Sequence, residues 1–207
     1  MRRPAAMGAA GQRRGADTKS EIRKVAIELF TERGYEGTSL REIAERLGIT
    51  KAALYYHYSS KESIVLSIFQ AHLDALDELV TWAREQPPGP ELLSQVVDRM
   101  VALGVGSGMA AMKFAMANQH VVRDLHHQSG RENAFGKMTE LFDILTGPDA
   151  SLEETLRVRS ALLSVNIVLM ASRGLTVTDA ELAGAARAIA RDILPIQPDL
   201  SVRETAS

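Results

Sequence analysis

The chain has 207 residues, 45% of them hydrophobic, which suffices for a core in one or two domains, and its lack of cysteine excludes disulfides, thiolate metal sites and cysteine nucleophiles. Its net charge of −2 hides an asymmetry, because residues 1–61 hold 12 Lys and Arg against 7 Asp and Glu, whereas residues 62–207 hold 12 against 19. The basic first third suits contact with phosphate groups, whereas the acidic remainder argues against a protein that binds nucleic acid over its whole surface.

Residues 1–16 combine four arginines with Ala, Gly and Pro, and they contain no apolar run long enough for a signal peptide or a membrane helix. We expect a disordered basic arm, which is either a solvated tail or an arm that contacts the backbone or minor groove of DNA. No export or membrane-spanning signal occurs elsewhere in the chain, so the sequence predicts a cytoplasmic protein with no membrane partner.

Capping boxes, in which Glu follows a Ser or Thr by three residues, are expected to mark the helix starts. They begin at Thr18, Ser39, Ser59, Ser151 and Thr178. The first box opens a helix over about residues 18–33 that ends at Gly34. The apolar face of this helix consists of Ile22, Val25, Ala26, Leu29 and Phe30.

Residues 39–57 predict two short helices separated by a turn at Gly48, a residue that accepts the left-handed backbone of a tight turn. Thr50 can cap the second helix, in which Ala53 and Leu54 should face inward. A plain helical hairpin would explain these features alone. The Tyr-Tyr-His run at residues 55–57 favours a recognition helix instead, because only part of such a cluster can be buried at once.

From about Thr18 to Leu66, roughly a quarter of its length, the chain resembles the tetracycline-repressor (TetR/AcrR) family of regulators. The matching pieces are LFTERGY (29–35), GTSLREIA (37–44), LGI (47–49), LYYHY (54–58) and SKE (60–62). Their order and spacing are specific, since a generic helix-turn-helix needs neither the lead-in nor the exit. The one departure is Tyr58, where the family often has Phe.

The resemblance implies an all-α fold, with an N-terminal three-helix helix-turn-helix DNA-binding domain and a larger C-terminal helical domain for ligand binding and dimerisation. We expect a basic arm over residues 1–16, the DNA-binding domain over 17–61, the ligand-binding and dimerisation domain over 62–195 and a tail over 196–207.

The family pattern also assigns DNA contacts. The expected phosphate contacts are Thr38, Ser39, Arg41, Tyr56 and Lys61, several of which lie at helix starts. The candidates for base edges are Thr50, Lys51, Ala52 and Tyr55, because Lys51 suits a guanine and Ala52 suits a thymine methyl group. His57 is expected to pack or to reach a phosphate.

A long helix over about residues 61–85 should follow and stop before the Pro87-Pro88-Gly89-Pro90 breaker. His72 lies on its apolar stripe, as a hydrogen-bonded core residue or as a ligand or switch. The remainder lacks a phosphate loop, a His-Glu-x-x-His pair and a nucleophile elbow, and His120 and His127 lie about 10 Å apart along a helix. We therefore expect no enzyme activity, no metal and no cofactor.

Methionine and phenylalanine residues are concentrated in the middle of the chain, either as ordinary core or as the lining of a pocket for a hydrophobic small molecule. The candidate ligand-binding residues are Met100, Met109, Met112, Met116, Phe135 and Met138, and Phe114 and Phe142 belong to the same group. The resemblance favours the pocket, because family members generally sense small ligands in this domain.

The last two expected helices, over residues 152–171 and 179–194, are apolar on more than one side. One subunit can bury only one side, so we expect a four-helix bundle about a two-fold axis, with burial inside a monomer as the alternative. The candidate interface residues are Leu163, Ile167, Met170, Ala186 and Ile189.

Together these features predict a homodimeric repressor that binds a palindromic operator in double-stranded DNA and is released by a small hydrophobic molecule. The alternative is a DNA-binding regulator controlled by a protein partner, with no small-molecule pocket, since a methionine-rich surface also suits a partner helix.

Overall fold

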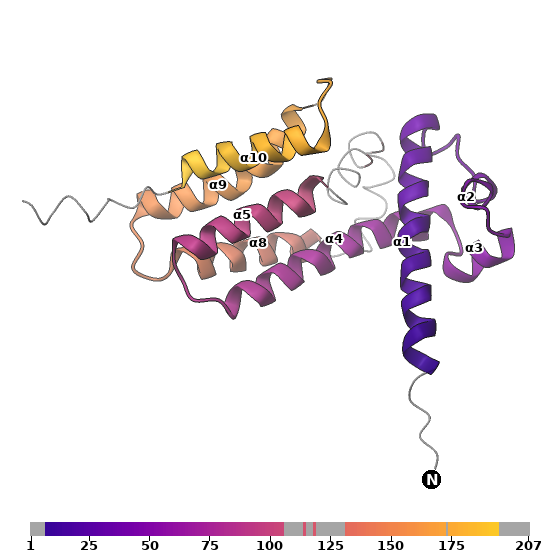
Figure 1. Ribbon diagram of the computed structural model, residues 1–207, viewed down its shortest axis with the longest axis horizontal. Helices are drawn as coiled ribbons and strands as arrows, with labels where there is room; N and C mark the ends of the chain where they lie inside the picture. The colour runs from indigo at the N-terminus through magenta and orange to yellow at the C-terminus, as the bar shows by residue number, and fades with distance from the viewer. Residues whose placement is uncertain (1–6, 106–113, 115–117, 119–130, 173, 195–207) are drawn as a thin grey trace, which may run out of the picture. The chain divides into compact units, whose positions relative to one another are not determined.

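The computed structural model describes residues 7–105, 114, 118, 131–172 and 174–194, and it describes the backbone alone for residues 7–16 and 131–135. Within these ranges the chain forms eight helices and no strand (Figure 1). The helices are α1 (Met7–Arg33), α2 (Leu40–Leu47), α3 (Lys51–His57), α4 (Lys61–Arg84), α5 (Pro90–Leu103), α8 (Arg131–Thr146), α9 (Leu152–Ala171) and α10 (Asp179–Ile193). The all-α fold predicted from the sequence is confirmed.

The chain divides into two compact units. Unit 1 comprises residues 1–75 and 107–133, and unit 2 comprises residues 76–106 and 134–207. The first part of α4 therefore belongs to unit 1 and the second part to unit 2. We expected a boundary after residue 61, whereas this division falls inside α4, after residue 75.

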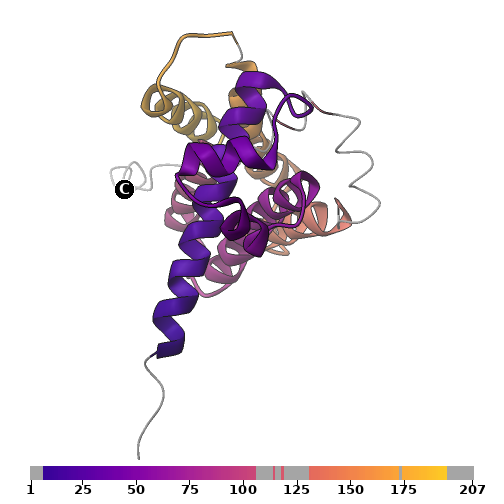
Figure 2. The same ribbon diagram turned by 90° about the vertical axis from the view of Figure 1, so that its right-hand side faces the viewer.

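The first helix begins earlier than the sequence suggested, at Met7. Residues 7–16, which we expected in a disordered arm, are helical, and Thr18 lies inside α1 instead of capping it. The stretch holds Ala, Gln and Arg, whose high helix propensity offsets its glycines. Figures 1 and 2 show this part of α1 extending past α2 and α3.

The helix-turn-helix forms as the local sequence predicts. Ser39 caps α2 in a reciprocal box with Glu42. Gly48 ends the helix with φ +68°, a left-handed conformation that favours glycine, and its N–H donates to the carbonyls of Ala44 and Glu45. Ile49 donates to the same Ala44 carbonyl at 3.0 Å, so the turn between α2 and α3 satisfies the last carbonyls of α2.

α3 is a single short helix held by one buried side chain. The hydroxyl of Thr50 caps it by accepting from the Ala53 N–H at 3.1 Å, and Leu54 is fully buried. Ala53, which we expected to face inward, is exposed. The helix spans only seven residues, so one residue in contact with the core leaves its other faces to solvent.

The core of unit 1 joins α1, α2, α3 and the first part of α4. Ala44 is 2% exposed where α2 packs on this core, and its small side chain permits a close approach. The buried residues are Ile22, Ala26, Leu29, Phe30, Tyr35, Ile43, Ala44, Leu54, Tyr58, Ile64, Val65, Ile68 and Phe114. The two short helices α2 and α3 are thereby fixed to α1 and α4 by one shared apolar cluster.

Unit 2 is a helical layer in which α9 packs on α10 and both contact α5. Gly104, directly after α5, lies so close to Leu169 of α9 that a Cβ atom there would collide with the leucine side chain. Asp98 of α5 accepts from Arg191 of α10 at 2.9 Å through both carboxylate oxygens.

The apolar stripe expected on the helix over residues 61–85 is confirmed on α4. Five of its residues are buried, namely Val65, Ile68, Leu76, Leu79 and Val80.

Candidate nucleic-acid interface

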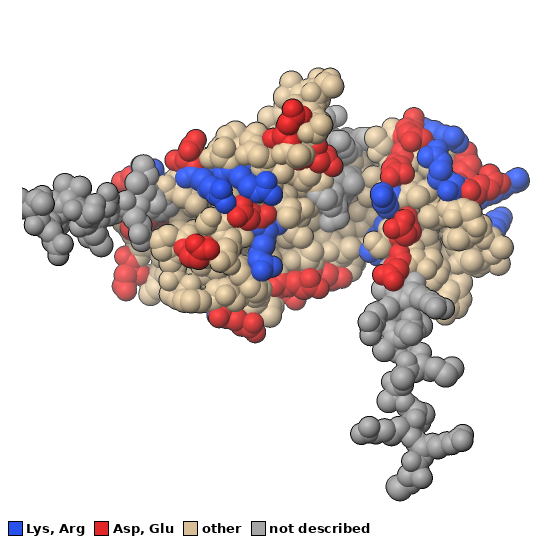
Figure 3. Space-filling model, viewed as in Figure 1, with Lys and Arg blue, Asp and Glu red and all other residues tan. Residues whose placement is uncertain are grey.

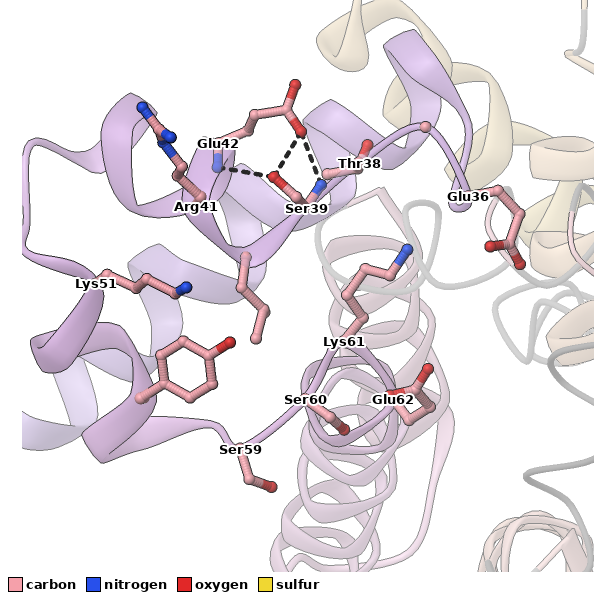
Figure 4. A pocket seen from close by; sticks show the side chains of 13 residues that line it. Glu36, Thr38, Ser39, Arg41, Glu42, Lys51, Ser59, Ser60, Lys61 and Glu62 are labelled. Carbon is pink, nitrogen blue, oxygen red and sulfur yellow. Dashed lines mark hydrogen bonds between the residues drawn. The ribbon is translucent and has the colours of Figure 1, made fainter.

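A hollow of about 510 Å³ opens on the surface of unit 1 where the starts of α2 and α4 face α3. It is lined by residues 36–42, 51, 55 and 59–62 (Figure 4). The residues come from four places in the sequence, and the turn of the helix-turn-helix brings them together. We call this site the hollow.

The start of α2 supplies one wall. The Ser39 hydroxyl accepts from the Glu42 N–H at 3.3 Å and donates to the Glu42 carboxylate at 2.8 Å, and the Ser39 N–H donates to the same carboxylate. Hydrogen bonds from the Ser39 backbone and hydroxyl lower the pKa of Glu42, and Arg33 at 2.9 Å adds to the effect. The N–H groups of Leu40 and Arg41 have no partner among the described residues, so they remain available to an anion.

Thr38 differs from the expectation that it contacts phosphate. Its side chain is 2% exposed, and the hydroxyl donates to the carbonyls of Gly34 at 2.9 Å and Leu29 at 3.2 Å. The single hydroxyl proton is thus shared between a carbonyl in the last turns of α1 and one just after the helix. The Thr38 side chain connects the end of α1 to the start of α2, and its hydroxyl proton is already engaged within the protein.

Lys61, the first residue of α4, is held in place by Tyr35. The Lys61 ammonium donates to the Tyr35 carbonyl at 2.8 Å and lies 4.4 Å from the centre of the Tyr35 ring. An ammonium carries three N–H groups, so two remain for another acceptor. The side chain reaches the hollow and forms no ion pair within the described residues, although its charge helps to lower the pKa of the neighbouring Glu62 (Figure 4).

Tyr35 also binds the neighbour of Lys61. Its hydroxyl donates to Glu62 at 2.6 Å. Burial raises the pKa of the Tyr35 phenol, and the adjacent Glu62 carboxylate raises it further. The same hydrogen bond is the largest cause that lowers the pKa of Glu62. Sequence reasoning placed Tyr35 in the LFTERGY piece but missed this role, because the contact with Glu62 joins residues 27 positions apart.

The face of α3 presents the aromatic and basic residues that the sequence singled out. Tyr56 is 87% exposed and Tyr55 is 45% exposed, while the Lys51 ammonium lies 5.5 Å from the centre of the Tyr55 ring. Thr50 and Ala52 are exposed beside them, and His57 is half-buried with its ring edge-on to Tyr56. The predicted partial exposure of the Tyr-Tyr-His run is confirmed.

Charges around the hollow are balanced. Arg41, Lys51 and Lys61 line it together with Glu36, Glu42 and Glu62. Glu42 and Glu62 accept hydrogen bonds from protein groups, so two of the three carboxylates are already engaged within the protein. Arg41 also pairs with Glu45 of the same helix, 2.7 Å away, although its side chain is 76% exposed. On the face drawn in Figure 3, basic and acidic side chains alternate over the described surface.

Only part of the expected ligand-binding set can be placed. Met100 is buried in α5 and Met138 is half-buried in α8. Met109, Met112, Met116 and the side chain of Phe135 lie outside the described residues. Phe114 lies in the core of unit 1.

His72 is half-buried, and burial lowers its pKa. Its Nδ1 is buried with no hydrogen-bond partner among the described residues, which differs from the hydrogen-bonded core histidine we expected. His120 and His127 lie outside the described ranges. In the part of the chain that the structure describes, no cluster of His, Asp or Glu could hold a metal ion. None of the described helices has the length and apolar character needed to span a bilayer.

The expected interface residues fall into two groups. Leu163, Ile167, Met170 and Ile189 are exposed, with Ile167 at 63%. Ala186 is fully buried within the subunit, so its assignment to the interface is wrong. It lies on the face of α10 that packs on the rest of unit 2, together with the buried Ala183 and Ala190.

The sequence of residues 22–68 matches the family of bacterial regulatory proteins called the tetR family. Among curated relatives, the activator FasR of Mycolicibacterium smegmatis is 38% identical over 73 residues, which cover 33% of each chain. IcaR of Staphylococcus aureus, a negative regulator of a biofilm operon, is 44% identical over 62 residues, 30% of this chain and 33% of the relative. The matched segments thus span about a third of these relatives.

Solved structures extend the likeness to most of the chain. A TetR-family regulator from Mesorhizobium loti has a TM-score of 0.58 and 24% identity, covering 87% of this chain and 96% of its own. PfmR, a TetR-family regulator from Thermus thermophilus, has a TM-score of 0.52 and 25% identity, covering 84% and 96%. Residues 22–68 therefore form a DNA-binding helix-turn-helix of the tetR family of bacterial regulatory proteins, and most of the chain shares its fold with solved TetR-family regulators.

Substituting Tyr35→Phe should raise the pKa of Glu62 towards its ordinary value, because the substitution removes the main hydrogen bond that lowers it. A carboxyl whose pKa is lowered by folding stabilises the fold above its unfolded pKa, and this contribution is lost as the pH falls through the folded pKa. The variant should therefore lose less stability on acidification below about pH 4.5. NMR titration of the Glu62 carboxyl and acid unfolding followed by circular dichroism measure both effects.

Tyr58→Phe is the matched control, since Tyr58 is also buried but its hydroxyl accepts from the Ser67 hydroxyl at 2.9 Å, whereas the Tyr35 hydroxyl donates to a carboxylate. It should leave the titration of Glu62 unchanged. The same Glu62 titration in the wild type and in Tyr35→Phe would contradict the assignment.

Proposed function

We propose that this protein is a homodimeric repressor that binds a palindromic operator and is released by a small hydrophobic molecule. The observation that carries the DNA-binding part is the hollow, where Arg41, Lys51 and Lys61 converge with unpaired amides of α2 beside an exposed recognition helix. Among the relatives, IcaR is named a negative regulator and FasR an activator. Repression requires only that the operator is occupied, which makes it the simpler outcome of this geometry.

The proposed DNA contacts follow from position and exposure. We assign phosphates to the start of α2, through its amides with Ser39 and Arg41, and to Lys61 at the start of α4. Tyr56 is exposed enough to donate its hydroxyl to a phosphate. We assign contacts with base edges to the exposed residues at the start of α3. In a dimer the two recognition helices would lie about 34 Å or slightly more apart. These base-reading residues are Thr50, Lys51, Ala52 and Tyr55.

Lys61→Ala should weaken binding to all DNA sequences alike and should lower the salt dependence of the affinity by about one unit per site, because a phosphate contact is lost. Lys51→Ala should instead relax the preference at one position of each half-site, at a cost of about 1–3 kcal/mol. Fluorescence anisotropy with the DNA that flanks the gene, with single-base variants and over a range of salt, separates the two effects.

Lys24→Ala is the matched control, because Lys24 is an exposed lysine of α1 that does not line the hollow. It should leave affinity and salt dependence unchanged. Unchanged operator affinity in both Lys51→Ala and Lys61→Ala would disprove the assignment of this surface to DNA.

We propose that two copies of the chain form a dimer through the exposed faces of α9 and α10. Leu163, Ile167 and Met170 form an exposed apolar stripe on α9. The exposed side of α10 carries small residues, and at Gly184 a Cβ atom would meet no other atom within 4 Å. Large side chains on one helix and small ones on the next suit the close packing of a four-helix bundle formed with a second copy.

Ile167→Asp should abolish the dimer, because it would bury an unpaired carboxylate at a cost on the order of several kcal/mol. Operator binding should fall with it, since each half-site would be bound alone. Light scattering and anisotropy measure the two outcomes. Ala102→Asp, on the exposed side of α5, is the control and should remain dimeric. A dimer that persists in Ile167→Asp would place the interface elsewhere.

The effector is proposed to be a small apolar molecule bound in unit 2, where the adaptable side chains Met100 and Met138 are available. Such a ligand should raise the melting temperature with its concentration and release the operator, and operator DNA should weaken the ligand by the same factor. A thermal-shift screen of an apolar library followed by anisotropy tests this. No shift across the library would favour the protein partner as the controlling ligand.

A further inference from the structure

Three aromatic rings meet in the core of unit 1, directly behind the hollow. The ring centres of Phe30 and Tyr35 lie 5.2 Å apart, those of Phe30 and Phe114 lie 5.5 Å apart, and those of Tyr35 and Phe114 lie 5.6 Å apart. All three side chains are at most 4% exposed. Tilted and edge-on contacts at these distances are the favourable geometries for aromatic pairs. Each ring therefore restricts the other two.

Phe114 is the only member of this trio that is distant in sequence. It follows α5 in the sequence, and its side chain lies in the core of unit 1. Asn118, one turn later, is buried and donates to the Phe114 carbonyl through its side chain at 3.1 Å and its backbone at 2.9 Å. This amide fixes the backbone that carries the ring.

Tyr35 is the link between this trio and the DNA surface. Its carbonyl accepts from Lys61, its ring lies beneath the Lys61 ammonium, and its hydroxyl donates to Glu62. Its carbonyl also accepts from the Thr38 N–H at 3.3 Å, next to the start of α2. A change in the position of the Tyr35 ring would therefore move the Lys61 ammonium.

We propose that Phe114 is a positioning residue for DNA binding, which fixes the Tyr35 ring and through it the Lys61 ammonium in the hollow. The proposal rests on the phosphate contact assigned to Lys61 above. A lysine held before binding loses less conformational freedom when it meets a phosphate, so a loosened Tyr35 lowers affinity although no DNA contact is removed.

A double-mutant cycle tests this, with a duplex selected by the wild-type protein from random-sequence DNA as the probe. Phe114→Leu should weaken binding about 3- to 10-fold in the wild-type background. In the Lys61→Ala background it should change affinity by less than about 2-fold, because the group that it positions is absent. The salt dependence of Phe114→Leu should shift towards that of Lys61→Ala.

Leu92→Ala, a truncation in the core of unit 2, is the stability control and should lower the melting temperature without weakening DNA binding. If Phe114→Leu does not fold at the assay temperature, Phe114→Met keeps the apolar volume, removes the ring and has the same expected pattern. Equal losses in both backgrounds, or no loss in either, would overturn the positioning role alone. If Lys61→Ala leaves affinity unchanged, the proposed phosphate contact fails and the positioning role fails with it.

Discussion

The attachment of the start of α4 to the end of α1 is the constraint on which the DNA-facing side of unit 1 depends. Tyr35 makes this attachment with its carbonyl, ring and hydroxyl, which contact two consecutive residues of α4. Thr38 adds a second attachment, since its hydroxyl satisfies carbonyls near the end of α1 just before α2 begins. The starts of α2 and α4 are thus fixed by residues 35–38, and without them the hollow would not have a defined width.

This arrangement also bears on the proposed phosphate contacts, because the charges around the hollow are balanced. A carboxylate opposes phosphate binding only if its charge is left unpaired near the ligand. Glu42 is engaged by the cap of α2 and by Arg33, and Glu62 by Tyr35. The pKa of each is lowered, so both remain charged near neutral pH, but hydrogen-bond donors of the protein already satisfy them. Lys61 keeps N–H donors that are not engaged within the protein, so the proposed phosphate contacts depend on the positions of the donors more than on net charge.

Local rules predicted the elements well where they depend on a few neighbouring residues. The capping boxes at Ser39, Ser151 and Thr178 form as expected, with both reciprocal hydrogen bonds present. Thr18 does not cap α1, because helical backbone continues upstream of it. At α4 the reciprocal bonds join Ser60 and Ser63, one residue later than the expected box at Ser59. Where two neighbouring residues can each cap a helix, the course of the backbone determines which one does so. Local sequence alone does not predict that course.

Local rules did not predict which side chains are buried in the folded protein. A threonine at a helix start and an alanine in a small-residue helix have the same local pattern whether they face solvent or core. Thr38 and Ala186 were assigned to surfaces but are buried. Phe114 shows the larger gap, since its neighbours in sequence are methionines and its neighbours in space are Phe30 and Tyr35. Such a contact cannot be predicted from local sequence, because the residues within one helix turn of residue 114 carry no information about its distance from residue 35.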